Sequence, residues 1–230
     1  MNTQNIPIII NSKNRLSCVK QLITRLELAN LSNIIIMDTG TTYEPLLEYY
    51  NTLPYQIIKL GGGNHLALWD LQVINKLDLL ESPIVYTDSD VIPTEYCPND
   101  FLQYMWDLLQ KYPDIPKVGF GLKIDDLPDH YLDKESVVGW ESQFWKDEIE
   151  PHNYRAPIDT TFALYRKGST RGWAQAIRTG EPYVAHHTTW YSDTNNLSEE
   201  DKYYTTHLAN GVCHWSRNLW KERTAEMSES

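Results

Sequence analysis

Two carboxylates, one residue apart, follow a short apolar run near the middle of the chain. The run is Ile84-Val85-Tyr86 and the carboxylates are Asp88 and Asp90. Branched and aromatic residues in succession predict a buried strand, and ligands of open α/β sheets bind where such strands end. Two hard oxygen donors at one strand end suit Mg²⁺ or Mn²⁺. The alternative is an ordinary turn, because Asp and Ser are common turn residues.

Two earlier apolar runs also end in small polar or acidic residues. Asn11 and Ser12 follow the first run, and Asp38 follows the second. Segments with helical periodicity separate the runs, and this alternation predicts an α/β fold with a mainly parallel, twisted sheet flanked by helices. The predicted strands lie near residues 6–11, 33–38, 55–60 and 83–87. Because parallel strands end at one edge of a sheet, we expect these polar residues near Asp88. The alternative is that Asn11 and Ser12 only terminate a strand and that Asp38 only forms a turn.

Helical spacing of apolar residues predicts one helix over 14–29, with Asn14 as its N-cap, and another over 66–80. A glycine-rich turn, residues 61–63, leads to Asn64 before the second helix. Two roles fit Asn64: contact with a ligand, or tolerance of a positive φ angle.

The pattern changes after Pro93. A helix is predicted near 101–109, followed by strands over 117–124 and 158–165, and regular periodicity fades from about residue 169. We therefore expect a single-domain core over 1–168 and a C-terminal extension over 169–230 that packs on the active site and ends in a loose tail.

The bulk composition excludes several classes of partner. The chain has 230 residues, with 31 acidic and 20 basic side chains and a net charge of −11. This charge argues against binding to nucleic acids or to anionic membranes. No apolar run approaches the roughly 18 residues of a membrane span, so no integral membrane segment is expected.

Cysteine usage bears on the cellular compartment. Cys18, Cys97 and Cys213 are odd in number, far apart, and fit neither a disulfide framework nor a metal spacing. The N-terminus also lacks the basic and apolar regions of a signal peptide. We therefore expect a cytoplasmic protein.

Four segments together resemble GT-A glycosyltransferases, close to family 2. Residues 8–12 with the following helix resemble the first βα unit of the family, and 37–42 resemble the end of its second strand. Asp88-Ser89-Asp90 resembles its DxD motif, and residues 158–166 are similar to a later strand of spore-coat-type inverting members.

The resemblance implies transfer of a sugar from a UDP- or GDP-sugar to a hydroxyl of a glycan or other acceptor. Asp38 would bind the base or ribose, and Asn11 and Ser12 would contact the nucleotide. Asp88 and Asp90 would hold a divalent cation, Mn²⁺ or Mg²⁺, and the diphosphate. His187 would complete the metal shell, since neutral imidazole also suits Mn²⁺. His186 and His214 are the alternatives.

The same resemblance implies that Asp159 is the base that deprotonates the acceptor hydroxyl, with inversion at the sugar. The chain lacks the clear Glu-Asp pair that the family carries after its last strand, so the base and the stereochemistry stay open. The rival bases are Asp125, Asp126 and Glu141.

Two other functions compete with sugar transfer. A strand that ends in Asp-Ser-Asp also resembles the nucleophile motif of haloacid-dehalogenase-type phosphohydrolases. In this chain, however, the motif follows the fourth predicted strand, and no downstream Gly-Asp-x-x-x-Asp pair is present. A non-catalytic sugar-binding protein is the third possibility, against which the intact Asp38, Asp88 and Asp90 speak.

Overall fold

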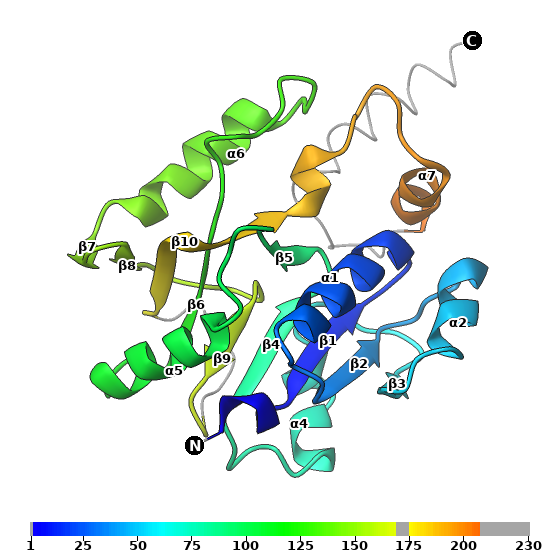
Figure 1. The fold of residues 1–230 in the computed structure, drawn as a ribbon. Helices are drawn as coiled ribbons and strands as arrows, with labels where there is room; N and C mark the ends of the chain where they lie inside the picture. Colours follow the sequence, from blue (N-terminus) through cyan, green and yellow to red (C-terminus); the bar gives the residue numbers. More distant parts are fainter. Residues whose placement is uncertain (1, 169–174, 208–230) are drawn as a thin grey trace.

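A mixed sheet runs through the computed structural model, which describes residues 2–168 and 175–207 (Figure 1). Its strand order is β3-β2-β1-β4-β9-β6-β10-β8-β7, and β5 pairs with β10 outside this path. The strands are β1 (Ile8–Ser12), β2 (Ile34–Asp38), β3 (Gln56–Lys59), β4 (Ile84–Asp88), β5 (Val91–Pro93), β6 (Lys117–Leu122), β7 (Glu148–Glu150), β8 (Asn153–Arg155), β9 (Ala163–Tyr165) and β10 (Ile177–His187). The α/β class, with a central sheet flanked by helices, is as predicted.

The N-terminal half of the sheet is parallel. β1 pairs with β2 and β4, β2 pairs with β3, and all three pairings are parallel. The predicted strands near 6–11, 33–38, 55–60 and 83–87 are thus confirmed. The ends of β1, β2 and β4 therefore meet at one edge, where in-register pairing aligns Asn11 with Asp88 and Ser12 with Asp38.

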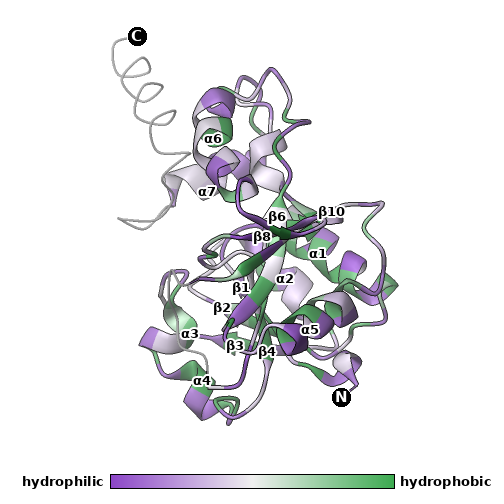
Figure 2. Cartoon of the chain, turned by 90° about the vertical axis from the view of Figure 1, so that its left-hand side faces the viewer, coloured by the Kyte–Doolittle hydropathy of each residue, from purple (hydrophilic) through white to green (hydrophobic). Residues whose placement is uncertain are grey.

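Helices cover both faces of this sheet. The helices are α1 (Leu16–Leu28), α2 (Glu44–Tyr50), α3 (Ala67–Asp70), α4 (Val73–Lys76), α5 (Phe101–Lys111), α6 (Lys134–Glu141) and α7 (Glu199–Thr206), with 3-10 turns η1 (Thr3–Asn5), η2 (Ser142–Trp145) and η3 (Thr188–Tyr191). Ile8 and Ile10 pack in the core cluster that includes α1 and α5, whereas Ile9 packs in the cluster with α3 and α4. Successive residues of a strand point to opposite faces, so a continuous apolar run is what a sheet covered on both sides requires. Figure 2 shows the hydrophobic colour concentrated on these strands.

Two helix predictions need correction. The helix expected over 66–80 is divided into α3 and α4, because Gln72 adopts a left-handed conformation with φ 58° that interrupts the hydrogen-bond ladder. The N-cap of α1 is Arg15 rather than Asn14. Asn14 instead has a positive φ of 54° and accepts hydrogen bonds from the amides of Thr42 and Tyr43.

The second half of the sheet differs more from the prediction. The strand expected over 158–165 is regular only in β9, which pairs antiparallel with β4 and β6. β10 was not predicted, because its middle contains Gly180 and Pro182, where its register against β6 shifts. Since β10 pairs with β6, β8 and β5, the sheet continues across the boundary expected at residue 168.

In the described part of the chain, no helix combines the length and the apolar character needed to cross a membrane.

Candidate functional site

The turn between β4 and β5 carries the two central carboxylates. β4 ends at Asp88, and Ser89 and Asp90 turn the chain into β5. The backbone amide of Asp88 donates to the carbonyl of Thr160 at 3.1 Å, and that of Ser89 donates to the carbonyl of Asn11 at 3.1 Å. The turn is therefore held by the neighbouring strand β1 and by the loop that precedes β9.

Asp88 is half-buried and already hydrogen-bonded on both carboxyl oxygens. The amide of Asn11 donates to Oδ1 at 3.1 Å, and the hydroxyl of Thr160 donates to Oδ2 at 2.7 Å. Burial, reinforced by the charge of Asp90, raises the pKa of Asp88 to about 8, although the two hydrogen bonds act in the opposite direction. Positive charge is what these surroundings lack.

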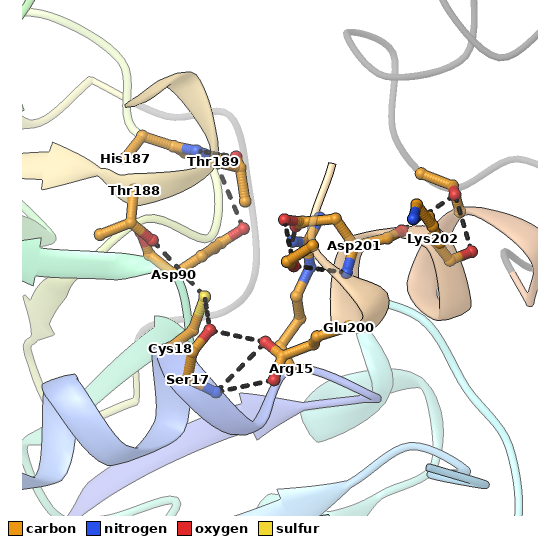
Figure 3. Close-up of polar contacts among 12 residues, drawn as sticks. Arg15, Ser17, Cys18, Asp90, His187, Thr188, Thr189, Glu200, Asp201 and Lys202 are labelled. Carbon is orange, nitrogen blue, oxygen red and sulfur yellow. Dashed lines mark hydrogen bonds and ion pairs between the residues drawn. The ribbon is translucent and has the colours of Figure 1, made fainter. Parts of the chain in front are cut away.

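Asp90 lies against His187 because β5 and β10 pair antiparallel. The ladder aligns Val91 with His187, and the amide of Thr188 donates to the carbonyl of Asp90 at 2.8 Å. His187 Nε2 lies 3.9 Å from Asp90 Oδ2. Figure 3 shows His187 and Asp90 at this edge, beside the start of α1.

The orientation of His187 is set by two neighbours. Its Nδ1 lies 2.8 Å from Thr189 Oγ1, and its ring stacks on Trp190 with centroids 4.5 Å apart and an interplanar angle of 11°. A hydrogen bond at one ring nitrogen fixes which nitrogen is left for a ligand. The Nδ1 atom is engaged with Thr189, and Nε2 is the ring nitrogen that faces Asp90.

The donor set fits a divalent cation only in part. Within residues 2–168 and 175–207, no group of three or more His, Cys, Asp or Glu side chains is close enough to hold a metal ion by itself. Asp90 and His187 provide one carboxylate oxygen and one imidazole nitrogen. Cations that use one or two protein ligands complete their shell with substrate phosphates and water, so this pair is compatible with a cation that arrives with a phosphate ligand.

Asp159 lies in the loop before β9, next to the residue that contacts Asp88. Its side chain is exposed, and Oδ1 accepts a hydrogen bond from the amide of Thr161 at 3.2 Å. Its carbonyl accepts from the buried Lys117 at 3.1 Å and from Tyr165 at 3.0 Å. Asp159 therefore precedes the strand instead of beginning it. Its carbonyl is fixed by Lys117 and Tyr165, while its side chain faces solvent.

The rival bases have other partners. The Oε2 atom of Glu141 is buried and accepts from Arg178 at 2.8 Å. Asp126 Oδ2 lies 3.3 Å from His186 Nε2, and Asp125 pairs with Lys123 at 2.8 Å. His214 lies outside the described residues.

The buried pair between Glu141 and Arg178 is not predictable from the sequence. Removing one partner of such a pair costs about 3–5 kcal/mol, because the other charge stays buried. Only the fold joins the two residues, so composition and spacing carry no signal for this pair.

The polar side chains at the end of β2 form hydrogen bonds with nearby protein groups. Asp38 is 3% exposed, and its Oδ1 accepts from the amides of Gly40 at 3.2 Å and Thr41 at 2.8 Å. Ser12, 1% exposed, accepts a hydrogen bond from the hydroxyl of Tyr50 at 2.9 Å. Both side chains lie at the expected edge and are engaged with neighbouring protein groups.

Asn64 is exposed and stabilises a short turn before α3, whose N-cap is Leu66. Its Oδ1 accepts from the amide of Leu66 at 2.8 Å. The positive φ angles of this turn belong to Gly61 and Gly63, so backbone conformation does not explain Asn64.

The individual contacts of α7, which belongs to the C-terminal extension, were not predicted. α7 lies across the start of α1, where Asp201 pairs with Arg15 at 2.5 Å and Glu200 accepts from Ser17 (Figure 3). The first turn of α1 has no acidic residue of its own, and this feature of the sequence is consistent with an anionic cap from another segment.

Comparisons with known proteins add little to this geometry. No protein-family model matches the chain, and no curated protein matches it in sequence. Among solved structures it is similar to a cytidylyltransferase from Leptospira borgpetersenii serovar Hardjo-bovis (strain JB197). That similarity has a TM-score of 0.38 and 14% identity, and it covers 62% of this chain and 73% of the other. A likeness at this level assigns no activity to the chain.

Proposed function

We propose that this protein is a metal-dependent glycosyltransferase that moves a sugar from a UDP- or GDP-sugar to an acceptor hydroxyl with inversion. One observation carries the proposal. The β5–β10 pairing brings His187 within 3.9 Å of Asp90, at the sheet edge where β4 also delivers Asp88.

Asp90 and His187 would hold the cation, Mn²⁺ or Mg²⁺, through a carboxylate oxygen and Nε2. When bound, a divalent cation supplies neutralisation of the charge that develops on a diphosphate leaving group. Asp88 lies two positions before Asp90. Burial and the charge of Asp90 raise its pKa, and a cation bound beside it would lower that pKa again.

Asp159 would accept the proton of the acceptor hydroxyl. Its side chain is exposed, while Lys117 and Tyr165 hold its carbonyl and thereby limit the movement of the loop. The neighbouring hydroxyl of Thr161 is buried and has no hydrogen-bond partner within the described residues. Unsatisfied polar atoms of this kind support a bound polar ligand, because leaving them unpaired is costly.

The nucleotide would bind at the ends of β1 and β2. Asp38 would accept from the base or ribose through its second carboxyl oxygen, and Asn11 and Ser12 would line the same edge. Asn11 Oδ1 is a buried acceptor without a hydrogen-bond partner in the described chain, which supports a donor group on a ligand there. Asn64 would contact the ligand from the glycine-rich turn, and the segment after residue 168 would pack over the site.

A thermal-shift screen of nucleotide-sugars with Mn²⁺ tests the proposal first. A UDP- or GDP-sugar should raise the melting temperature only with the metal present, and turnover should then release the nucleotide. Release of p-nitrophenol from p-nitrophenyl phosphate, without protection by any nucleotide, would replace the proposal with a phosphohydrolase. Binding of sugars without turnover would indicate a non-catalytic protein.

A further inference from the structure

α7 lies over the start of α1 and is held there through polar contacts. Both carboxyl oxygens of Glu200 accept from the amide of Ser17, at 3.2 and 3.0 Å, and Oε1 also accepts from the Ser17 hydroxyl at 2.6 Å. Asp201 Oδ1 pairs with Arg15 Nη1 at 2.5 Å. No residue of α7 is fully buried, but half-buried Tyr203 packs on Tyr43 with ring centroids 4.9 Å apart, and Arg15 lies over the ring of Tyr204 at 3.8 Å.

The position of Glu200 is one that favours anions. The first amides of a helix have no partner within it, and the helix dipole adds positive potential there. In α1 the N-cap Arg15 makes no side-chain capping bond, and the first turn has no acidic residue. The cap is instead supplied by Glu200, 183 residues further along the chain. A mobile anionic ligand could make the same contacts.

Arg15 provides a second, independent indication of a ligand. Its side chain is only 9% exposed, and its Nε has no hydrogen-bond partner among the residues that the structure describes. A buried guanidinium with an unused donor suits a ligand with several acceptor oxygens, because Arg binds carboxylate and phosphate through paired hydrogen bonds.

This position adjoins the candidate site. Cys18 Sγ, in the first turn of α1, lies 3.5 Å from Thr188 Oγ1, and the Thr188 amide donates to the Asp90 carbonyl at 2.8 Å. Figure 3 shows Ser17 and Cys18 between Glu200 on one side and Asp90 on the other. A diphosphate near Asp90 would therefore have Arg15 and Ser17 as neighbours.

We propose that Arg15 and the N-terminus of α1 form an anion subsite for the phosphates of a nucleoside diphosphate, and that α7 blocks it by placing Glu200 and Asp201 there. The nucleoside part rests on the proposed function, whereas the competition between carboxylate and phosphate does not. Phosphate oxygens replace the two carboxylates with the same class of hydrogen bond. Release of α7 also separates Tyr203 from Tyr43 and Tyr204 from Arg15, and both tyrosines are only half-buried. α7 is thus an autoinhibitory segment that anionic ligands displace.

Titration calorimetry with EDTA present, so that no metal takes part, tests the competition. UDP, inorganic pyrophosphate and uridine are the three probes. Glu200→Gln should bind UDP and pyrophosphate at least about fivefold more tightly than the unmodified protein, the lower end of usual coupling between sites. Glu199→Gln is the matched control, since Glu199 lies in the same helix and pairs only with Lys202 among the printed contacts of its side chain. It should bind as the unmodified protein does.

Uridine and hydrogen exchange complete the test. Uridine has no phosphate, so its affinity should be the same in both variants, and an equal gain for uridine would overturn the proposal. Pyrophosphate should speed amide exchange over residues 199–206 in the unmodified protein. Equal affinities of Glu200→Gln and Glu199→Gln for pyrophosphate would also overturn it. If pyrophosphate bound as tightly as UDP, the subsite would recognise phosphate without the nucleoside.

The result is separable from that of the proposed function. Tighter pyrophosphate binding in Glu200→Gln, with no turnover of any nucleotide-sugar, would support the subsite and refute the transferase. Turnover together with unchanged pyrophosphate binding would support the transferase and refute the subsite.

Discussion

The ends of β2 and β4 both carry aspartates at the same edge of the sheet, but their partners have different origins. The Oδ1 atom of Asp38 accepts from two amides within three residues of it. The oxygens of Asp88 accept from Asn11 and Thr160, which are 77 and 72 residues away in the chain. The β2 carboxylate stabilises its own turn, whereas the β4 carboxylate joins separate elements.

Charge separates the two regions further. Burial, followed by the like charge of Asp90, raises the pKa of Asp88 to about 8, while Asp90 faces His187. An acid with local backbone donors needs no ligand to explain it, since Asp commonly stabilises turns. Two crowded acids beside an imidazole gain from a bound cation. We therefore expect the chemistry at the β4 end, and the nucleotide-binding role proposed for Asp38 depends on its second carboxyl oxygen.

The largest effect is expected from Asp90→Asn. The change removes the carboxylate that faces His187, and loss of metal assistance is worth several kcal/mol, on the order of 10⁴-fold in turnover. The measurement is nucleotide release from the donor with Mn²⁺, together with a melting curve to verify the fold. Asp125→Asn, which alters an exposed acid paired with Lys123, is the control and should keep normal turnover. Near-normal rates for Asp90→Asn would remove the distinction between the two strand ends.

Asp159→Asn should reduce turnover by about 10²–10⁴-fold, the usual contribution of a positioned base. Nucleotide and Mn²⁺ affinity should stay near normal, because the substitution keeps the side-chain shape and the acceptor for Thr161. Single-turnover rates and calorimetry separate the two quantities, and NMR of the product reports its anomeric configuration. Full activity, or retention of configuration, would refute the role of base.

Asp38→Ala should weaken binding of the free nucleotide by about 1–3 kcal/mol, the cost of a lost hydrogen bond to a charged group. It should change turnover less than Asp90→Asn does. Asp38→Asn is the companion variant, since its amide oxygen still accepts from Gly40 and Thr41 and so preserves the turn. If both variants bound UDP and GDP normally, Asp38 would be a turn residue alone.

The smallest effect is expected from Tyr50→Phe, which removes the hydrogen bond to Ser12. The free energy of unfolding in urea should fall by about 0.5–1.5 kcal/mol. Ser12→Ala should cost a similar amount, and the double variant should cost less than the sum, because both changes remove one interaction. A loss of nucleotide affinity in Ser12→Ala beyond that in Tyr50→Phe would show that Ser12 also contacts the ligand.

Much of the N-terminal half was predictable from local patterns. Apolar runs separated by helical periodicity located β1 to β4, and the parallel order then placed Asn11, Asp38 and Asp88 at one edge. These features depend on side-chain type and on spacing within about one supersecondary unit, so they can be read without knowledge of distant contacts. One local feature was not predictable: Gln72 adopts a left-handed conformation that divides the helix, although the hydrophobic periodicity is continuous there.

The remaining features of the site were decided by tertiary structure. β10 has a register shift around Gly180 and Pro182 and no clear strand period, yet its pairing with β5 delivers His187 to Asp90. Arg178 and Glu141 meet across the fold, and Glu200 reaches Ser17 over a separation of 183 residues. Such contacts form only after the folded sheet brings distant surfaces together. Their stability depends on the packing of the whole domain and not on the local sequence. Residue types determined what chemistry was available to this chain, and packing decided which of those residues meet.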